Sequence, residues 1–228
     1  MIKLSGVSHT YGEGPTRREV LRDVDLELGE QRIGVIGANG SGKSTFARLL
    51  NGLVLPTCGT VTVDGLDTRR DGAAVRRRVG FCFSDPDAQI VMPTVREDVA
   101  LGLRRHRLSR AEVAHRVEAA LDAVGLGDHA DHPAHLLSSG QKQLLALTSV
   151  LVTEPDVLVL DEPTTLLDLR NARDVVRRLA GLRQQVVLVT HDLTALDGFD
   201  RVLTIDAGRV VFDGDPLGAV AAYVAAMA

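Results

Sequence analysis

A glycine-rich turn between an apolar strand and a helix constrains this chain more than any other stretch. The segment reads Gly37-Ala-Asn-Gly-Ser-Gly-Lys-Ser-Thr45; it follows an apolar run that ends at Ile36 and precedes a helix-like run that starts at Phe46. Such a turn leaves backbone N–H groups free at a helix N-terminus, where they bind phosphate. The glycines allow backbone approach that side chains would block. We therefore predict an α/β fold with a phosphate loop at this point.

The residue types in the loop match its expected chemistry. Lys43 supplies a positive charge for the β- and γ-phosphates, and the Ser44 hydroxyl can bind Mg²⁺. An ordinary glycine loop is the alternative interpretation, which the strand before and the helix after make less favourable. The sequence predicts that ATP or a similar triphosphate is bound by Gly37, Asn39, Gly40, Ser41, Gly42, Lys43, Ser44 and Thr45.

Polar residues follow two further apolar strands. Asp161 and Glu162 come directly after Val157–Leu160, and His191 follows Val186–Val189. In a parallel sheet the carboxyl ends of the strands form the ligand-binding edge. We expect Asp161 to hold Mg²⁺ opposite Ser44, usually through water, and Glu162 to polarise an attacking water. His191 can donate a hydrogen bond to the γ-phosphate. The alternative is that these are solvated polar strand ends.

A second helix start suited to anions lies about a hundred residues after the first. Leu137-Ser-Ser-Gly-Gln141, here called the signature segment, precedes the helical run Gln143–Val152. Serine and glycine favour an N-cap with free N–H groups. Taken alone it would be an ordinary helix cap. A simple phosphate-loop kinase has no use for a second such site, so we rate that class unfavourable.

Composition limits the remaining classes. The chain has 228 residues, 45% of them hydrophobic, and a net charge of −4, which argues against a general nucleic-acid binder. We expect Cys58 and Cys82 to be small core residues in a reducing cytosol. The chain shows neither a signal peptide at its start nor an apolar run of the ~18 residues that a membrane helix needs. We therefore expect a soluble protein whose membrane role comes through a partner.

The order of the predicted elements favours one domain. Alternation in Val24–Leu28 indicates a half-exposed antiparallel strand, and Ser109 with Glu112 forms a capping box for a helix that ends at Val124. The simplest arrangement is one nucleotide-binding core with a helical insertion. Strands are predicted at Ile2–Val7, Ile33–Ile36, Thr60–Val63, Val79–Phe83, Arg201–Ile205 and Val210–Phe212, and helices at Leu169–Leu182 and Leu193–Phe199.

Together these motifs resemble the ATP-binding-cassette (ABC) ATPases over essentially the whole chain. The resemblance rests on Tyr11, the phosphate loop (Walker A), the signature segment, Leu160–Thr164, Asp168 and His191. It implies the ABC ATPase form of the P-loop NTPase fold: a RecA-like core with an antiparallel β subdomain, residues 1–90 and 150–228, and an inserted α-helical subdomain at about 91–149. The whole of residues 1–228 would be a single ABC ATPase domain.

The resemblance also implies roles and partners. It assigns Tyr11 to stacking on adenine, Ser44 and Asp161 to Mg²⁺, Glu162 and His191 to catalysis, and Asp168 to a loop that crosses a dimer interface. Two cassettes would pack head to tail, as a homodimer or with a similar ATPase. The partner subunit's ATP would then be contacted by Ser138, Ser139, Gly140 and Gln141. A signature segment that cannot reach its own nucleotide needs such a partner.

Residues 85–102 resemble the corresponding region of energy-coupling-factor (ECF) transporter ATPases. Those work at the cytoplasmic face of the membrane with a membrane coupling (T) protein and a substrate-binding (S) protein, and import vitamins or metal ions. The length and Phe83-Ser-Asp-Pro86 resemble the biotin-transporter members. The alternatives are a cobalt or nickel ECF importer and another ABC transporter.

Three positions depart from the family pattern. Ser84 stands where glutamine usually helps to hold Mg²⁺, Ser139 replaces a signature glycine, and Leu144 replaces a common arginine. Gln89 is a candidate to compensate for Ser84. These changes bear on turnover and coupling and leave ATP binding intact.

Other functions are less favoured. DNA-repair ATPases with the same chemistry insert a long coiled coil before the signature, but only about ninety residues lie there in this chain. Translation-factor cassettes carry two motif sets in one chain, and this chain has one. Arginine clusters at Arg69–Arg70, Arg76–Arg78 and Arg104–Arg107 are either solvated faces or contacts for acidic lipid headgroups or a partner loop.

Overall fold

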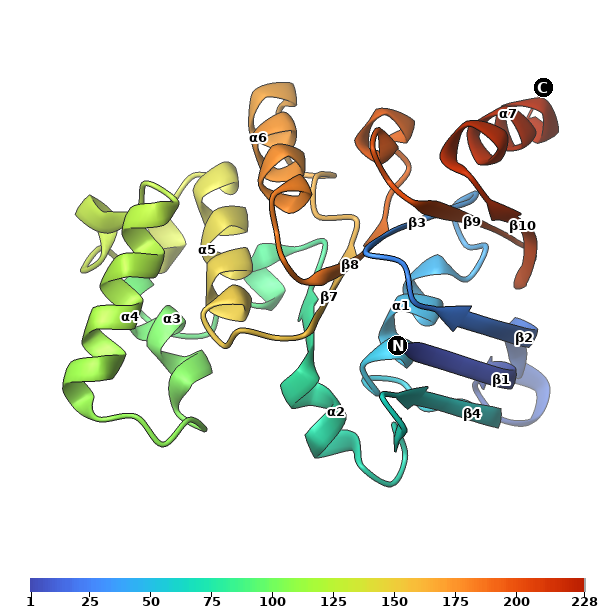
Figure 1. Cartoon of the computed structure of the whole chain (residues 1–228), viewed down its shortest axis with the longest axis horizontal. Helices are drawn as coiled ribbons and strands as arrows, with labels where there is room; N and C mark the ends of the chain where they lie inside the picture. The colour runs from blue at the N-terminus through green and yellow to red at the C-terminus, as the bar shows by residue number, and fades with distance from the viewer. Residues whose placement is uncertain (228) are drawn as a thin grey trace.

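The computed structural model describes residues 1–227, in which two sheets and a helical segment meet (Figure 1). The larger sheet has the strand order β10-β9-β3-β8-β7-β6, with all neighbours parallel except β10 and β9. Its strands are β3 (Arg32–Ile36), β6 (Val79–Cys82), β7 (Val157–Asp161), β8 (Gln185–Val189), β9 (Arg201–Asp206) and β10 (Arg209–Gly214).

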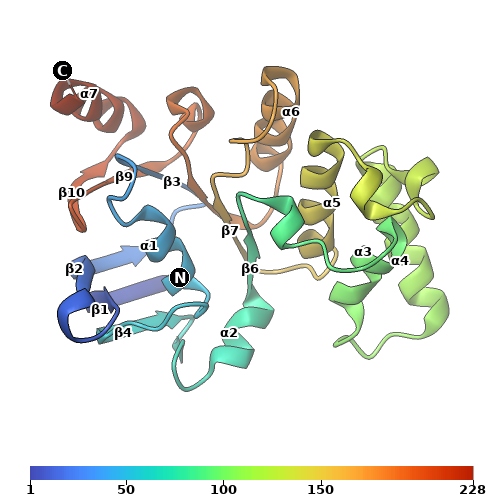
Figure 2. The same cartoon turned by 180° about the vertical axis from the view of Figure 1, so that it is seen from behind.

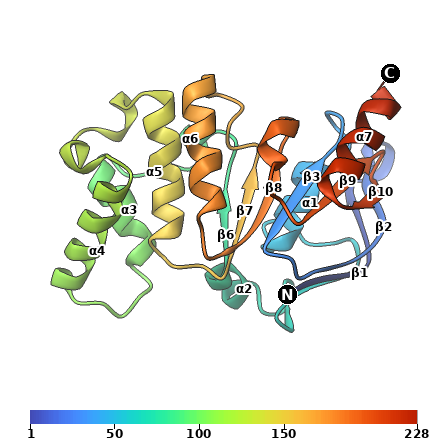
Figure 3. The ribbon, with the colours of Figure 1, turned by 45° about the horizontal axis from the view of Figure 1, so that its top comes forward.

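The central strands are apolar on both faces because both faces are covered. In β7, Val157 and Val159 pack in one hydrophobic cluster, whereas Leu158 and Leu160 pack in another. Buried parallel strands therefore appear as continuous apolar runs, without alternation. One face packs against α1 (Lys43–Leu50), and the other against α5 (Ser139–Leu151) and α6 (Leu169–Ala180), which stand side by side in Figure 3.

The smaller sheet is antiparallel, with the order β2-β1-β4-β5. Its strands are β1 (Ile2–Tyr11), β2 (Arg18–Leu28), β4 (Cys58–Val63) and β5 (Leu66–Asp67). The predicted alternation in Val24–Leu28 is confirmed, since Val24, Leu26 and Leu28 are buried and the residues between them are exposed. Figure 2 shows this sheet beside α1, below the larger one.

Helices α3 (Val95–Leu103), α4 (Arg110–Ala123) and α5 form a separate hydrophobic cluster. Its buried members run from Val95 to Val152. Capping boxes begin all three helices, at Thr94, Ser109 and Ser138. The three helices have 9, 14 and 13 residues, far short of a coiled-coil insertion. A boundary of the helical subdomain at about residues 91 and 149 stays a prediction.

Several expectations need correction. Cys58 is exposed, because it shares the outward face of β4 with Thr60 while Val61 and Val63 point inward; Cys82 is buried, and burial raises the pKa of its thiol to about 12. The predicted helix Leu193–Phe199 is a single turn, Leu193–Leu196. The sequence prediction missed α2 (Gly72–Arg78), and α7 (Pro216–Met227) closes the described part of the chain. None of the helices described there is long and apolar enough to cross a bilayer.

Candidate nucleotide-binding site

The phosphate loop joins β3 to α1 and has the backbone geometry that its glycines predict. Gly40 has φ 78° and Gly42 has φ 113°, both in the left-handed region that favours glycine. Gly42 is the N-cap of α1 and makes no side-chain cap, so the first N–H groups of the helix face the loop. The helix start therefore has the donors that a phosphate group requires.

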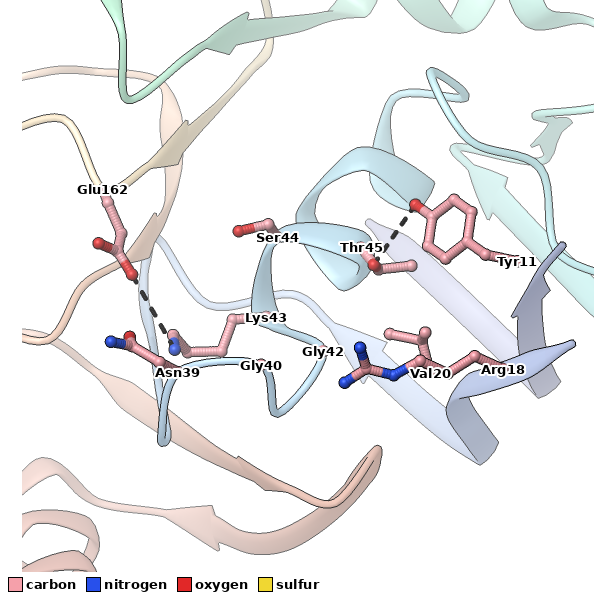
Figure 4. Close-up of a pocket in the computed structure, with 10 residues that line it drawn as sticks. All are labelled: Tyr11, Arg18, Val20, Asn39, Gly40, Gly42, Lys43, Ser44, Thr45 and Glu162. Atoms are coloured by element: carbon pink, nitrogen blue, oxygen red, sulfur yellow. Dashed lines mark hydrogen bonds and ion pairs between the residues drawn. The ribbon is translucent and has the colours of Figure 1, made fainter. Parts of the chain in front are cut away.

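Lys43 crosses the loop to which it belongs. Its ammonium donates to the carbonyl oxygens of Gly37 at 2.8 Å and Ala38 at 2.9 Å. Its Nζ also lies 4.0 Å from the Glu162 carboxylate (Figure 4). The side chain is almost fully buried, and burial lowers the pKa of its amine. Lys43 thus holds a desolvated positive charge at the centre of the loop.

Ser44 and Asp161 meet although they are 117 residues apart. The Ser44 hydroxyl donates to Asp161 Oδ1 at 2.9 Å. Burial raises the pKa of Asp161, against the opposing effects of this hydrogen bond and of Arg48 at 3.6 Å. A hydroxyl and a carboxylate oxygen are ligands that Mg²⁺ accepts beside phosphate oxygens. The pair fits the predicted metal role.

Glu162 turns away from its neighbour Asp161. Its φ is 52°, an uncommon left-handed value for a residue with a side chain, and its N–H donates to the Val189 carbonyl at 2.9 Å. Strained backbone of this kind clusters at functional sites. The turn aims the Glu162 carboxylate at the loop, where His191 Nδ1 lies 3.2 Å from its Oε2. The structure thus brings Lys43, Glu162 and His191 together.

A cavity of about 520 Å³ opens beside the loop, a size that suits a small ligand (Figure 4). Tyr11 lies at one end of it, with its hydroxyl 3.5 Å from Thr45 Oγ1. The lining also includes Arg18 and Val20, which the sequence prediction missed. They lie on β2, outside any motif. The full lining is Tyr11, Arg18, Val20, Asn39, Gly40, Gly42, Lys43, Ser44, Thr45 and Glu162.

The signature segment lies elsewhere. Ser138 is the N-cap of α5, and its hydroxyl and the Gln141 side chain form a capping box. Within residues 1–227, none of the signature residues lines the cavity beside the phosphate loop. Figure 1 shows α5 and α1 apart, with strands of the larger sheet between them. The two helix starts that the sequence predicts to bind phosphate are therefore separate in the structure.

Asp168 is linked to the signature segment through Asn171, a residue that the sequence prediction missed. Asp168 caps α6 and accepts from the N–H and the side-chain amide of Asn171, both at 2.9 Å. The Asn171 side chain packs so closely on Gly140 that a Cβ at that glycine would lie 2.7 Å from it. Ser139, which replaces a signature glycine, is exposed.

Gln89 does not replace the usual glutamine at Ser84. Its side-chain oxygen accepts from Phe83 N–H at 3.0 Å, and its amide donates to the Ala146 carbonyl at 2.9 Å. Both functional ends of the amide are thus engaged between β6 and α5. Gln89 connects the end of β6 to α5, the helix that begins in the signature segment and is here called the signature helix.

Comparison with known proteins identifies the family to which the chain belongs. The family model described as ABC transporter matches residues 21–165. The chain belongs to the ABC transporter family, whose ATP-binding members hydrolyse ATP. It is 54% identical over 98% of its length to a putative ABC transporter ATP-binding protein of Deinococcus radiodurans, which it covers to 97%.

Two further relatives narrow the resemblance. The chain is 48% identical to the biotin transport ATP-binding protein BioM of Rhodobacter capsulatus, over 91% of this chain and 89% of that one. It is 41% identical to the energy-coupling factor transporter ATP-binding protein EcfA1 of Caldanaerobacter subterraneus, over 95% and 81%. Within its family, the chain is thus an ECF-type ABC ATPase that resembles BioM.

Solved structures agree with this fold. CbiO1 of Clostridium perfringens, part of the ABC transporter complex cbiONQ, has a TM-score of 0.84 at 31% identity and covers 99% of this chain and 93% of its own. The cassette MJ0796, solved as a dimer bound to ADP and Pi, has a TM-score of 0.84 at 29% identity, over 95% and 99%. The predicted ABC ATPase fold is confirmed.

Proposed function

We propose that this chain is the ATP-hydrolysing subunit of an ECF importer, at the cytoplasmic face of the membrane, and that biotin is the imported compound. The observation that carries the proposal is the separation of the two phosphate-binding helix starts. Phosphate loop, acids and His191 form one half of an ATP cage. The signature segment lies apart from the cavity beside the phosphate loop. It forms the other half of an ATP cage, for the nucleotide bound by a second subunit. The relatives support the choice of importer and of biotin.

Each residue has a defined role in this proposal. Tyr11 stacks on adenine, and Lys43 with the loop N–H groups binds the phosphates. Ser44 and Asp161 would hold Mg²⁺, which neutralises charge on the β- and γ-phosphates. Glu162 accepts a proton from the attacking water, and His191 holds the Glu162 carboxylate and contacts the γ-phosphate.

The dimer would complete each cage. Ser138, Ser139, Gly140 and Gln141 of one subunit would contact the nucleotide of the other, and Asp168 would lie at the crossing between them. ATP closes such a pair, and hydrolysis with product release opens it. We further propose that residues 84–102 transmit this motion to the T protein, because Val91 there is 66% exposed and Lys142, next to the signature segment, pairs with Asp87 at 2.7 Å.

Capture from native membranes tests the assignment. The tagged chain, solubilised with its membrane, should retain two integral membrane proteins and a second cassette, either another copy or a similar ATPase. The captured complex should bind radiolabelled biotin. Binding of Co²⁺ or Ni²⁺ instead would retain the importer and change its substrate. Capture of soluble proteins alone, with ATPase activity stimulated by DNA, would contradict the proposal.

A further inference from the structure

A basic hollow lies on the side of the molecule away from the nucleotide. It has a volume of about 380 Å³ and is lined by the end of α2 and the end of α3. α2 leads directly into the first residue of β6, whereas Asp161 is the last residue of the parallel strand β7 and Glu162 follows it. The hollow and the ATP site therefore belong to opposite ends of the same strands. Figures 1 and 2 both show α2 and the α3–α4 connection along the lower side.

Three arginines share this hollow without a counter-charge. Arg76 and Arg77 come from α2 and Arg105 follows α3, with His106 beside it. Within residues 1–227, none of the three arginines forms an ion pair or a side-chain hydrogen bond to a carboxylate. The acids on neighbouring elements are used elsewhere: Asp64 pairs with Arg78 and the N-terminus, and Glu154 pairs with Arg116 and Arg183.

The two segments that supply the arginines of the hollow are free of acids, and Thr153, which completes the lining, is followed by the paired Glu154. Residues 72–84 and 99–111 contain no aspartate or glutamate, in a chain whose net charge is −4. Gathering like charges costs stability, and a local cost of this kind is typical of a binding site. Arg104, Arg107 and Arg110 continue the basic surface beyond the hollow, and Arg104 and Arg107 are exposed and unpaired among the described residues. One small phosphate compound would not cover this extended surface, whereas a layer of phosphates would.

We propose that this hollow binds the phosphate headgroup of an acidic phospholipid. Arginine guanidinium groups recognise phosphate through paired N–H donors, and each basic residue near an anionic bilayer adds about tenfold or less to binding. Leu101 and Gly102 also line the hollow and carry no charge. The inference rests on the proposed function in one respect, which is that membrane partners hold the chain at a bilayer.

Vesicle binding by the purified full-length chain tests this proposal. The natural chain should sediment with vesicles of phosphatidylcholine mixed with phosphatidylglycerol, and not with phosphatidylcholine alone, and salt should weaken the binding. The variant Arg76→Gln/Arg77→Gln/Arg105→Gln should bind on the order of 100-fold more weakly. The matched control, Arg170→Gln/Arg173→Gln/Arg177→Gln, removes three exposed charges from α6 and should bind as the natural chain does.

The outcomes separate the explanations. Equal loss in both triple variants would overturn the proposal, because it would indicate diffuse attraction. Displacement of the chain from vesicles by free glycerol phosphate would also overturn it, in favour of a soluble phosphate compound. ATP binding and capture of membrane partners, measured on the same variants, report on the proposed function separately. If the variant of the three hollow arginines binds ATP, membrane partners and vesicles as the natural chain does, only the proposed lipid site is contradicted.

Discussion

At the scale of single residues, the site depends on how β7 ends. Asp161 is the last residue of the buried strand and points to Ser44, while the left-handed backbone of Glu162 sends the next carboxylate towards Lys43 and His191. The two adjacent carboxylates therefore face different partners. Asp161 is placed to bind a metal ion, and Glu162 is placed to accept a proton.

Replacing the Glu162 carboxylate should separate hydrolysis from binding. Glu162→Gln keeps the shape of the side chain but removes the proton acceptor, so steady-state ATP turnover should fall by about 10²–10⁴-fold. ATP affinity, measured by fluorescence titration, should stay nearly unchanged. Lys43→Ala is the contrasting variant, and should weaken ATP binding roughly 10–100-fold through loss of charged hydrogen bonds. Undiminished turnover in Glu162→Gln would contradict the assigned role.

At this scale, the sequence predicted those site residues that lie next to one another along the chain. The phosphate loop and the two acids at the end of β7 were predictable, because each lies directly next to an apolar run in the sequence. Arg18 and Asn171 were not, because a strand face and a helix contact bring them in from outside any motif. Cys58 was wrongly expected in the core, although the alternation of β4 indicated its outward position. The functional roles of all these residues stay predictions.

At the scale of elements, the loop after β6 is fastened to the signature helix. Gln89 joins Phe83 to Ala146, Lys142 pairs with Asp87, and Asp98 of α3 accepts from the Ser149 hydroxyl at 2.8 Å. These bonds connect the edge of the core sheet with α5. A movement of the helical segment would therefore be felt at residues 83–89, close to where a membrane partner is proposed to dock.

Gln89 should matter more for stability than the ion pair beside it. Gln89→Ala removes two hydrogen bonds of a half-buried amide, so the free energy of unfolding in urea should fall by about 1–3 kcal/mol. Asp87→Ala removes the partner of an ion pair whose carboxylate is 65% exposed, and should cost about 0–1 kcal/mol. A smaller loss for Gln89→Ala than for Asp87→Ala would show that the amide does not fasten the loop.

Elements with strong local signals were predicted within a few residues. The apolar runs of β3, β7 and β8 and the capping box before α4 are examples. α2 was missed because its seven residues include one buried side chain, Val75, and no capping side chain. The course of the chain between strands, which decides that α5 and α1 lie apart, depends on long-range packing and was inferred from family resemblance.

At the scale of the whole molecule, we propose that the described chain holds two halves of different ATP cages. An ATP bound at the phosphate loop would meet Lys43, Ser44 and Glu162 but no signature residue of its own chain. In the proposed dimer, two copies packed head to tail would place each signature helix start beside the other copy's phosphate loop, in a closed twofold arrangement. The dimeric cassette MJ0796, at a TM-score of 0.84, shows that this fold forms pairs.

Molar mass measured by light scattering tests the shared cage most directly. With Mg²⁺ and ATP, the Glu162→Gln chain, whose turnover is blocked, should elute at twice the monomer mass of 24.4 kDa, and without nucleotide it should elute as a monomer. Adding Ser138→Arg, which places a bulky cation at the signature helix start, should prevent dimer formation while leaving ATP bound. A nucleotide-saturated chain that remains monomeric both alone and with the second cassette captured from its membrane, or a dimer indifferent to Ser138→Arg, would contradict the account.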